Sequence, residues 1–343
     1  MTGAAGLRQD DGMLFLPPLS ILDLAPVVEG DSTRQALLNS IDLARLADGL
    51  HYRRYWVAEH HNMEGVASSA TAVLIGQLAA ATSRIRVGAG GIMLPNHAPL
   101  TIAEQFGTLA ELFPGRIDLG LGRAPGTDRP TMRALRRSLE STGEDAFPND
   151  VLELQAYLGP PKADATVRAV PGQGTSVPLW LLGSSLYGAQ LAAYLGLPFA
   201  FASHFAPEML MQALQIYRAT YRPSERHPKP HAAVGLNVIV APTDEEARHL
   251  FTSAQQRFLG MVRGRRGKLP PPVASMDELW TPAEAAQVDR MLSESVVGSP
   301  ETVKAGLLAT AERTGADEFI AACAVHDHAL RRRSYQLLDE LAA

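Results

Sequence analysis

The sequence Leu-Asn-Val-Ile-Val at residues 236–240 is a short aliphatic run without regular polar alternation. Such a run is typical of a strand that is covered on both faces in a parallel sheet. This run is part of 234–240, one of eight β-branched or aliphatic runs along the chain. The other seven lie at 19–24, 54–58, 85–93, 116–121, 178–182, 198–202 and 318–324. Each precedes a turn and a stretch with helical periodicity, so the pattern predicts a closed (β/α)8 TIM barrel.

Helix boundaries support this assignment. Asp31-Ser-Thr precedes a predicted helix at 34–50, Ser68-Ser69 precedes one at 70–81, and Pro300-Glu301 opens one that stops at Gly315. Residues 1–18 are predicted to form an N-terminal extension, and 19–343 a single barrel domain. Two connections, 160–178 and 263–282, are longer than usual. We expect insertions at the C-terminal face of the barrel, with 261–282 as a lid over its ligand.

Composition narrows the class of protein. The 343 residues are 46% hydrophobic and 20% charged, as in ordinary globular chains, and the formal net charge is -5. This charge provides no general attraction to nucleic acid or anionic lipid. Cys323 is the one cysteine, which fits a reducing cytoplasm. The N-terminus does not resemble a signal peptide, and the apolar run 70–81 is shorter than the roughly 20 residues of a membrane span, so we expect a soluble cytoplasmic protein.

The first candidate site is Glu59-His60-His61-Asn62, which directly follows the run 54–58. Barrel enzymes carry catalytic groups at the C-terminal ends of their strands. If the strand continues through them, His60 and His61 point apart and cannot share a metal ion, and no other metal-ligand spacing occurs. The alternative is that structural hydrogen bonds hold both histidines at a strand end.

Glycine is dense in the third run, which reads Gly88-Ala-Gly90-Gly91-Ile-Met-Leu94-Pro95. Glycine inside a strand indicates close approach by a ligand or another backbone, and a flat ring could lie there. The pattern is not a dinucleotide fingerprint, because the helix opens only near Pro99 and has no glycine at its start. The same glycines could instead relieve crowding at a barrel corner.

Two further segments predict an anion site. Arg123 follows the fourth run within Gly120-Leu-Gly122-Arg123-Ala-Pro125-Gly126-Thr127-Asp128, and a guanidinium can fork onto phosphate oxygens. The fifth run leads through Gly183-Ser184-Ser185-Leu186-Tyr187-Gly188 into a helix at 189–195, whose free N-terminal amides favour an anion. Together they favour phosphate, although helix capping alone would explain the two serines.

These motifs occur together and in order. They are Glu59-His60-His61, Gly88 to Pro95 with His97-Ala-Pro99, Gly115-Arg116-Ile-Asp-Leu-Gly120-Leu-Gly122-Arg123, Gly183-Ser184-Ser185, Val297-Gly298-Ser-Pro300-Glu301 and Gly315-Ala-Asp-Glu318. The set resembles the bacterial luciferase-like flavin monooxygenases. The resemblance covers about 19–338, and 56–126 is its most specific part.

The resemblance implies a barrel that binds reduced flavin mononucleotide (FMN) as an exchanging co-substrate from a separate flavin reductase. By position, His60 matches the active-site histidine beside the isoalloxazine ring. Gly90-Gly91 matches the strand site of a cis peptide beside the ring, and Arg123, Ser184 and the amides near Tyr187 and Gly188 match the phosphate site. Ala89, Gly183 and Ser185 are expected to bind the cofactor as well. Gly122 stands where the luciferases proper carry a cysteine, which argues against luminescence with a long-chain aldehyde.

The function expected from this resemblance is that reduced FMN reacts with dioxygen at C4a, giving a peroxide that oxygenates a small organic substrate. His60 would be the acid/base, since its reference pKa near 6.5 suits proton exchange at neutral pH. One alternative is hydride transfer by the deazaflavin F420, whose polyanionic tail could bind Arg263, Arg265, Arg266 and Lys268 unless these form a solvated loop. The other is a flavin-binding protein without turnover.

The helix predicted at 70–81 is apolar nearly all round. It could therefore pack against a second subunit as well as the barrel, and the resemblance also implies a dimer through early helices. Packing within one chain is the alternative.

Overall fold

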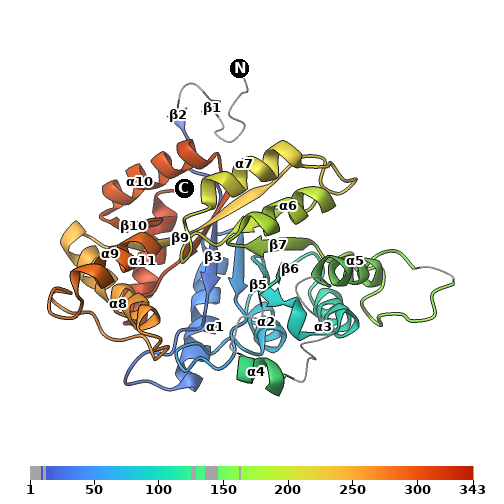
Figure 1. Ribbon diagram of the computed structural model, residues 1–343, viewed down its shortest axis with the longest axis horizontal. Helices are drawn as coiled ribbons and strands as arrows, with labels where there is room; N and C mark the ends of the chain where they lie inside the picture. The colour runs from blue at the N-terminus through green and yellow to red at the C-terminus, as the bar shows by residue number, and fades with distance from the viewer. Residues whose placement is uncertain (1–8, 11–12, 125–128, 136–145, 162–163, 343) are drawn as a thin grey trace.

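The computed structural model describes residues 9–10, 13–124, 129–135, 146–161 and 164–342. Eight parallel strands form a closed barrel, in which β9 pairs with β8 on one side and β11 on the other. Around the barrel they are β3 (Leu19–Asp23), β4 (Arg54–Val57), β5 (Arg86–Met93), β6 (Ile117–Gly122), β7 (Leu179–Gly183), β8 (Phe199–Phe201), β9 (Ala232–Val240) and β11 (Glu318–Ala322). Helices surround these strands (Figure 1), so the predicted (β/α)8 barrel is confirmed.

The helices are α1 (Thr33–Gly49), α2 (Thr71–Ala80), the 3-10 turn η1 (Leu94–Asn96), α3 (Pro99–Leu112), α4 (Arg129–Ala134), α5 (Phe147–Leu158), α6 (Leu186–Leu195), α7 (Leu210–Thr220), α8 (Asp244–Val262), α9 (Pro282–Met291), α10 (Pro300–Thr314) and α11 (His328–Glu340). Within the described residues, none combines the length and apolar character needed to cross a bilayer. Two short strands, β1 (Gln9–Asp10) and β2 (Met13–Leu14), pair with each other before the barrel begins.

Local sequence signals set many of these helix boundaries. The side chain of Ser32 caps α1 by accepting from the backbone N–H of Gln35, and Thr243 and Ser299 cap α8 and α10 in the same way. At the other end, α10 stops at Gly315, whose φ of 57° is left-handed and favours glycine. The sequence analysis missed the short strands β1 and β2, and it also missed β10 (Ser295–Gly298), which pairs in parallel with β9 outside the barrel.

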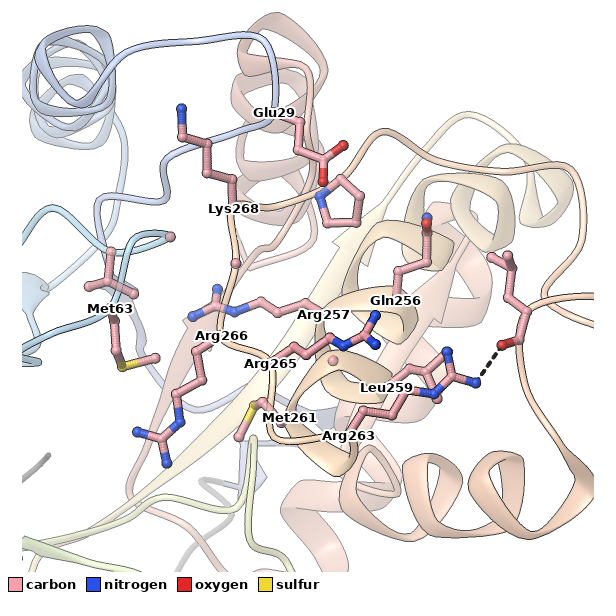
Figure 2. A pocket seen from close by; sticks show the side chains of 16 residues that line it. Glu29, Met63, Gln256, Arg257, Leu259, Met261, Arg263, Arg265, Arg266 and Lys268 are labelled. Carbon is pink, nitrogen blue, oxygen red and sulfur yellow. Dashed lines mark hydrogen bonds between the residues drawn. The ribbon is translucent and has the colours of Figure 1, made fainter. Parts of the chain in front are cut away.

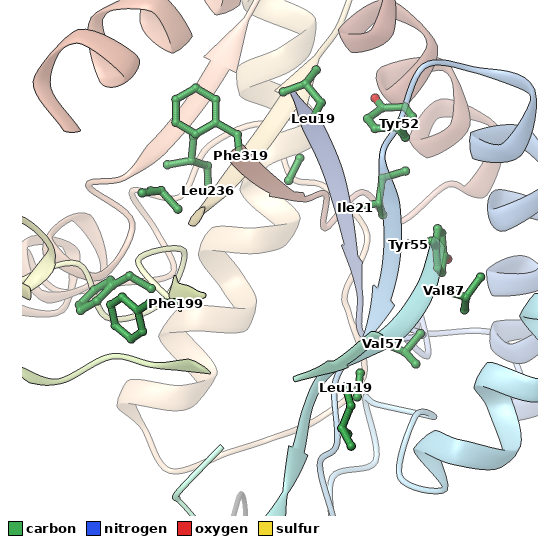
Figure 3. Close-up of a cluster of buried hydrophobic side chains, with 14 of the residues drawn as sticks. Leu19, Ile21, Tyr52, Tyr55, Val57, Val87, Leu119, Phe199, Leu236 and Phe319 are labelled. Carbon is green, nitrogen blue, oxygen red and sulfur yellow. The ribbon is translucent and has the colours of Figure 1, made fainter. Parts of the chain in front are cut away.

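Side chains that alternate along the strands form two separate cores. The larger core lies between the barrel and its helices and includes Ile21, Tyr55, Val57 and Phe199 (Figure 3). A smaller core, which includes Leu22, Trp56, Trp180 and Ile320, fills the barrel itself. The barrel is therefore a packed unit that presents its ligand-binding groups at a rim.

A buried polar network occupies the end of the barrel where the strands begin. Arg54 starts β4 and donates from Nε to Glu318 Oε1 at 2.7 Å and from Nη1 to Asp118 Oδ2 at 2.8 Å. Its guanidinium carbon lies 4.7 Å from the ring centre of Trp180. This network fills the N-terminal end, so the opposite rim, where the strands end, is available for a site.

The two long connections lie at different ends of the barrel. The 160–178 connection leads from α5 into the start of β7, and Gly172 packs against Gly107 of α3. The 263–282 connection joins α8 to α9 and is bonded to the loop after β3, because Leu269 N donates to Val27 O and Glu29 N donates to Leu269 O, both at 2.9 Å. The second connection thus lies over the C-terminal rim.

Candidate active site

The predicted site residues follow neighbouring strands along one arc of the C-terminal rim. Just beyond β4, Glu59 N donates to Gly91 O of β5 at 3.3 Å. Farther along the arc, Met93 of β5 is opposite Gly122 of β6, and Gly122 is opposite Leu182 of β7. Strand register therefore brings the histidine, glycine and arginine segments to adjacent positions on the rim.

Glu59 holds two histidines together. Its buried carboxylate lies 2.8 Å from His61 Nε2 and 2.9 Å from His97 Nε2, and it also accepts from Met93 N at 3.1 Å. Burial alone would raise the pKa of Glu59, but hydrogen bonds from His97 and His61 and the charge of His97 lower it below its usual value. An ionised carboxylate only accepts, so each histidine must donate from Nε2. His61 and His97 therefore have structural partners, as the alternative reading of the motif allows.

His60 has different surroundings. Strand β4 ends at Val57, so the extended segment does not continue through the histidines, and His60 is half-buried in the loop that follows. His204 follows β8, on the diametrically opposite side of the barrel, and His60 is one of the groups that lower its pKa. Both histidines follow strand ends at the C-terminal rim.

His204 is a residue that the sequence analysis missed. Its Nδ1 is buried and has no hydrogen-bond partner among the residues that the structure describes. Burial, followed by the charges of His60 and Arg257, lowers its pKa to about 4. The ring is therefore neutral at physiological pH and can donate or accept one proton there.

Close packing explains the glycines of β5. A Cβ at Gly88 would lie 2.4 Å from Asp118 O, and one at Gly91 would lie 2.6 Å from Gly120 O. Crowding between β5 and β6 thus accounts for both. A Cβ at Gly90 would lie 2.9 Å from Leu22 Cδ1 and 3.1 Å from Trp56 Cβ, so the core inside the barrel crowds this position too. Gly90 is nevertheless partly exposed between the buried residues Ala89 and Gly91, so some of its backbone is accessible at the rim. The Gly90–Gly91 peptide is cis, as the resemblance implies.

The two predicted halves of the anion site lie against each other. The guanidinium carbon of Arg123 lies 4.1 Å from the ring centre of Tyr187, in the first turn of α6. Ser185 is the N-cap residue of α6, but its side chain makes no capping hydrogen bond. Capping therefore does not explain Ser185, and the first N–H groups of α6 can receive an anion beside Arg123.

Small residues keep this turn compact. A Cβ at Gly183 would lie 3.7 Å from the Cα of Gly188, so the strand end and the first turn of α6 run close together. Ser184 is half-buried there, next to Ser185. The neighbouring segment 125–128 of the arginine motif lies outside the described residues.

Within the described part of the chain, no group of three or more His, Cys, Asp or Glu side chains is arranged to hold a metal ion. The residues at the rim instead match the parts of a phosphorylated flavin: a cation and helix N-terminus for the phosphate, bare backbone for a flat ring, and imidazoles for proton transfer. Of these groups, the sequence analysis gave no role to Glu59, His97 or His204. Glu59 and His97 lay inside motifs that were part of the resemblance, whereas His204 lay outside all of them.

Comparison with known proteins places these features in a family. The family model described as luciferase-like monooxygenase matches residues 19–318. A luciferase-like monooxygenase of Escherichia coli K12 is 55% identical over 93% of this chain and 95% of its own, and the N-acetyl-S-alkylcysteine monooxygenase of Bacillus subtilis is 31% identical over 94% and 97%. The solved structure of apo-MsnO8 has a TM-score of 0.85 and 38% identity, and covers 95% of this chain and 98% of its own. The chain belongs to the luciferase-like monooxygenase family, whose members are oxidoreductases.

Proposed function

We propose that this protein is a monooxygenase that binds reduced FMN at the C-terminal rim and uses dioxygen to oxygenate a small organic substrate. The observation that carries the proposal is the contact of Arg123 with Tyr187 beside the uncapped N-terminus of α6. A helix N-terminus and a guanidinium on one side of a rim suit a dianionic phosphate. The relative named for N-acetyl-S-alkylcysteine supports oxygen transfer to a small molecule.

The rim residues have distinct roles in this proposal. Arg123, the N–H groups of α6, Ser184 and Ser185 bind the phosphate, and the backbone of Ala89, Gly90 and Gly91 supports the ring. When bound, reduced FMN supplies the electrons with which dioxygen is split between product and water. His60 moves the proton that this chemistry requires, and the 263–282 connection closes over the site as a lid and excludes water.

The phosphate site is tested by comparing FMN with riboflavin, which has no phosphate. Arg123→Gln removes charge-assisted hydrogen bonds of about 1.5 to 3 kcal/mol, so the Kd of FMN should rise about 10- to 100-fold while that of riboflavin stays within twofold. Arg222→Gln is a matched control, because Arg222 stacks on Tyr194 at 4.2 Å elsewhere in the structure. Equal losses for FMN and riboflavin in Arg123→Gln would remove Arg123 from the phosphate site.

The reaction is tested with photoreduced FMN bound to the protein and mixed with air-saturated buffer. We expect the native protein to consume oxygen, and His60→Ala to lower oxygenation turnover at least tenfold with the Kd of FMN unchanged. Oxygen-independent oxidation of reduced F420 would support the deazaflavin alternative instead. Binding of FMN without any oxidation would support a flavin carrier.

Two partners belong to the same proposal. A separate flavin reductase would supply reduced FMN, and a second copy of the chain would pack on the early helices. On α2 the side chain of Val73 is 71% exposed, which leaves an apolar residue on the outer face of that helix. Sedimentation at micromolar concentration tests the dimer, and a monomer there would contradict it.

A further inference from the structure

A cavity of about 280 Å³ lies beside the barrel mouth, apart from the Arg123 site. It is bounded by the loops after β3 and β4, the second half of α8 and the connection that follows α8 (Figure 2). Its described lining contains five cationic side chains and one carboxylate: Arg257, Arg263, Arg265, Arg266, Lys268 and Glu29. In a chain with a net charge of -5, this is a concentrated positive surface.

Two of these cations already have partners. Arg263 donates from Nε to Glu284 at 2.7 Å and from Nη2 to Leu279 O at 2.8 Å. Lys268 donates to Asp31 O at 2.9 Å. Arg263 thus ties the connection to α9, and Lys268 ties it to the loop after β3.

Arg257 differs from them because no ion pair or hydrogen bond to the described residues satisfies its guanidinium, although the side chain is half-buried. Burial, together with the positive charge of Arg331, lowers the pKa of Arg257. An arginine nevertheless stays charged in a protein, and no Arg257 nitrogen is among the fully buried atoms of the described residues that lack a partner, so its donors are accessible to a ligand in the cavity. A charge held this way is normally matched by an opposite charge, and an anionic ligand would supply it.

Arg265 and Arg266 have no ion pair among the described residues either, and both are exposed at the edge of the cavity. In Figure 2, Arg257 reaches across the cavity toward the loop that carries Met63. A guanidinium fork in this position can bind both oxygens of an acid group at once.

Most of the remaining lining is apolar, and Gln256 contributes one uncharged polar side chain. Met63, Val66, Leu259, Met261 and Leu279 complete the wall, and two of them are flexible methionines that adapt to different shapes. The cavity thus combines cations with apolar surface, which suits a ligand with an acid group and a hydrocarbon body.

The cavity is connected to the proposed reaction centre through the chain. The loop after β4 carries His60 at its start and Met63 in the cavity wall. A molecule anchored at Arg257 would therefore lie beside the loop that carries His60.

We propose that this cavity binds the anionic group of the organic substrate, and that the substrate is a small carboxylic, sulfonic or phosphonic acid with an apolar body. Arg257 is its primary anchor, and Arg265 and Arg266 attract the acid to the cavity. The proposal rests on the proposed function only in calling the bound acid a substrate, because binding of the acid requires neither FMN nor turnover.

The test uses octanoate and 1-octanol, which share a chain of eight carbons and differ in charge. Calorimetry at low ionic strength should show octanoate binding the native protein at least tenfold more tightly than 1-octanol. Arg257→Gln should abolish this preference and leave the Kd of FMN unchanged. Arg248→Gln is the matched control, because Arg248 lies on the same helix and is paired with Glu245 on the exposed surface, so the preference should persist.

The double variant Arg265→Gln/Arg266→Gln changes only exposed side chains and should lower the preference at least threefold, which keeps the test valid if Arg257→Gln fails to fold. Octanoate binding no tighter than 1-octanol, or a preference that survives in folded Arg257→Gln, would overturn the proposal. So would displacement of octanoate by FMN, which would place the acid at the flavin phosphate site. Binding of F420 that requires Arg257, without binding of octanoate, would assign the cations to a cofactor tail. Failure of FMN binding alone would refute the proposed function and leave the acid site standing.

Discussion

Replacing Glu318 by Gln should destabilise the barrel from inside, because this carboxylate is the centre of the polar network at the N-terminal end. Glu318 is fully buried. Its Oε1 accepts from Ser20 Oγ at 2.5 Å and Arg54 Nε at 2.7 Å, and its Oε2 lies 3.1 Å from Arg54 Nη2 and 3.3 Å from His231 Nε2. An amide has one acceptor oxygen and no charge, so it cannot replace these interactions.

The size of the effect follows from the pKa of Glu318. Burial alone would raise it, but hydrogen bonds from His231, Arg54 and Ser20 and the charge of Arg54 lower it from 4.5 to about 2. That difference corresponds to about 3 kcal/mol of folding free energy, at about 1.4 kcal/mol per pH unit. Because the folded pKa is the lower one, this stability is present above pH 4.5 and is lost as the pH falls toward 2.

Urea unfolding from pH 7 down to pH 3 measures this contribution. Breaking a buried pair from one side costs about 3 to 5 kcal/mol, so Glu318→Gln should lose that much at pH 7, and its deficit should shrink below pH 4.5. Glu245→Gln is the matched control, since Glu245 forms an exposed pair with Arg248 and should lose less than about 0.5 kcal/mol. A deficit below 1 kcal/mol at pH 7, or one that stays constant down to pH 3, would refute the reasoning.

Three further predictions concern single residues. Gly91→Ala should lower the free energy of unfolding in urea by about 1 to 3 kcal/mol, because its Cβ would meet Gly120 O. Gly49→Ala has open space at its Cβ and should be neutral or stabilising, so equal effects of the two variants would argue against crowding. The ring of His204 should titrate near pH 4 in NMR spectra, and a midpoint above 6 would be inconsistent with its burial. Because the folded pKa lies below the ordinary value of 6.5, the contribution of His204 to the free energy of unfolding should fall as the pH drops below 6.5. Thr281→Ala removes one half of the capping box of α9 and should cost about 1 kcal/mol, with faster hydrogen exchange at the start of that helix; unchanged exchange there would count against the cap.

The barrel could be predicted because each βα unit carries its own signals. Aliphatic runs, polar caps and terminal glycines act over a few residues, so the eight barrel strands were found to within about two residues at each end. Strand β10 was not found because it has only four residues, three of them partly exposed, and it pairs with β9 alone. Its apolar pattern is too short to be told from a turn before a helix.

The site was predictable only where strand order decided it. Arg123 and Tyr187 come together because β6 and β7 are neighbours, so two strand-end motifs had to meet. Glu59 and His97 are 38 positions apart, and only the folded turn at η1 shows that one carboxylate orients both His61 and His97. Arg257 resembles any cation of an amphipathic helix in the sequence, since its missing partner is visible only once the surrounding chain is in place.

The two proposed anion sites follow different strands, and this separation has a physical consequence. Arg123 follows β6, whereas Arg257 lies on α8 after β9, three strands farther around the barrel. Two anions a few ångströms apart repel strongly in a partly desolvated mouth, so one shared cation could not hold a flavin phosphate and a substrate acid together. Separate anchors let both ligands bind at once, each by its charged end. In the proposed function their other ends would then lie at the C-terminal rim, where His60 would move the proton.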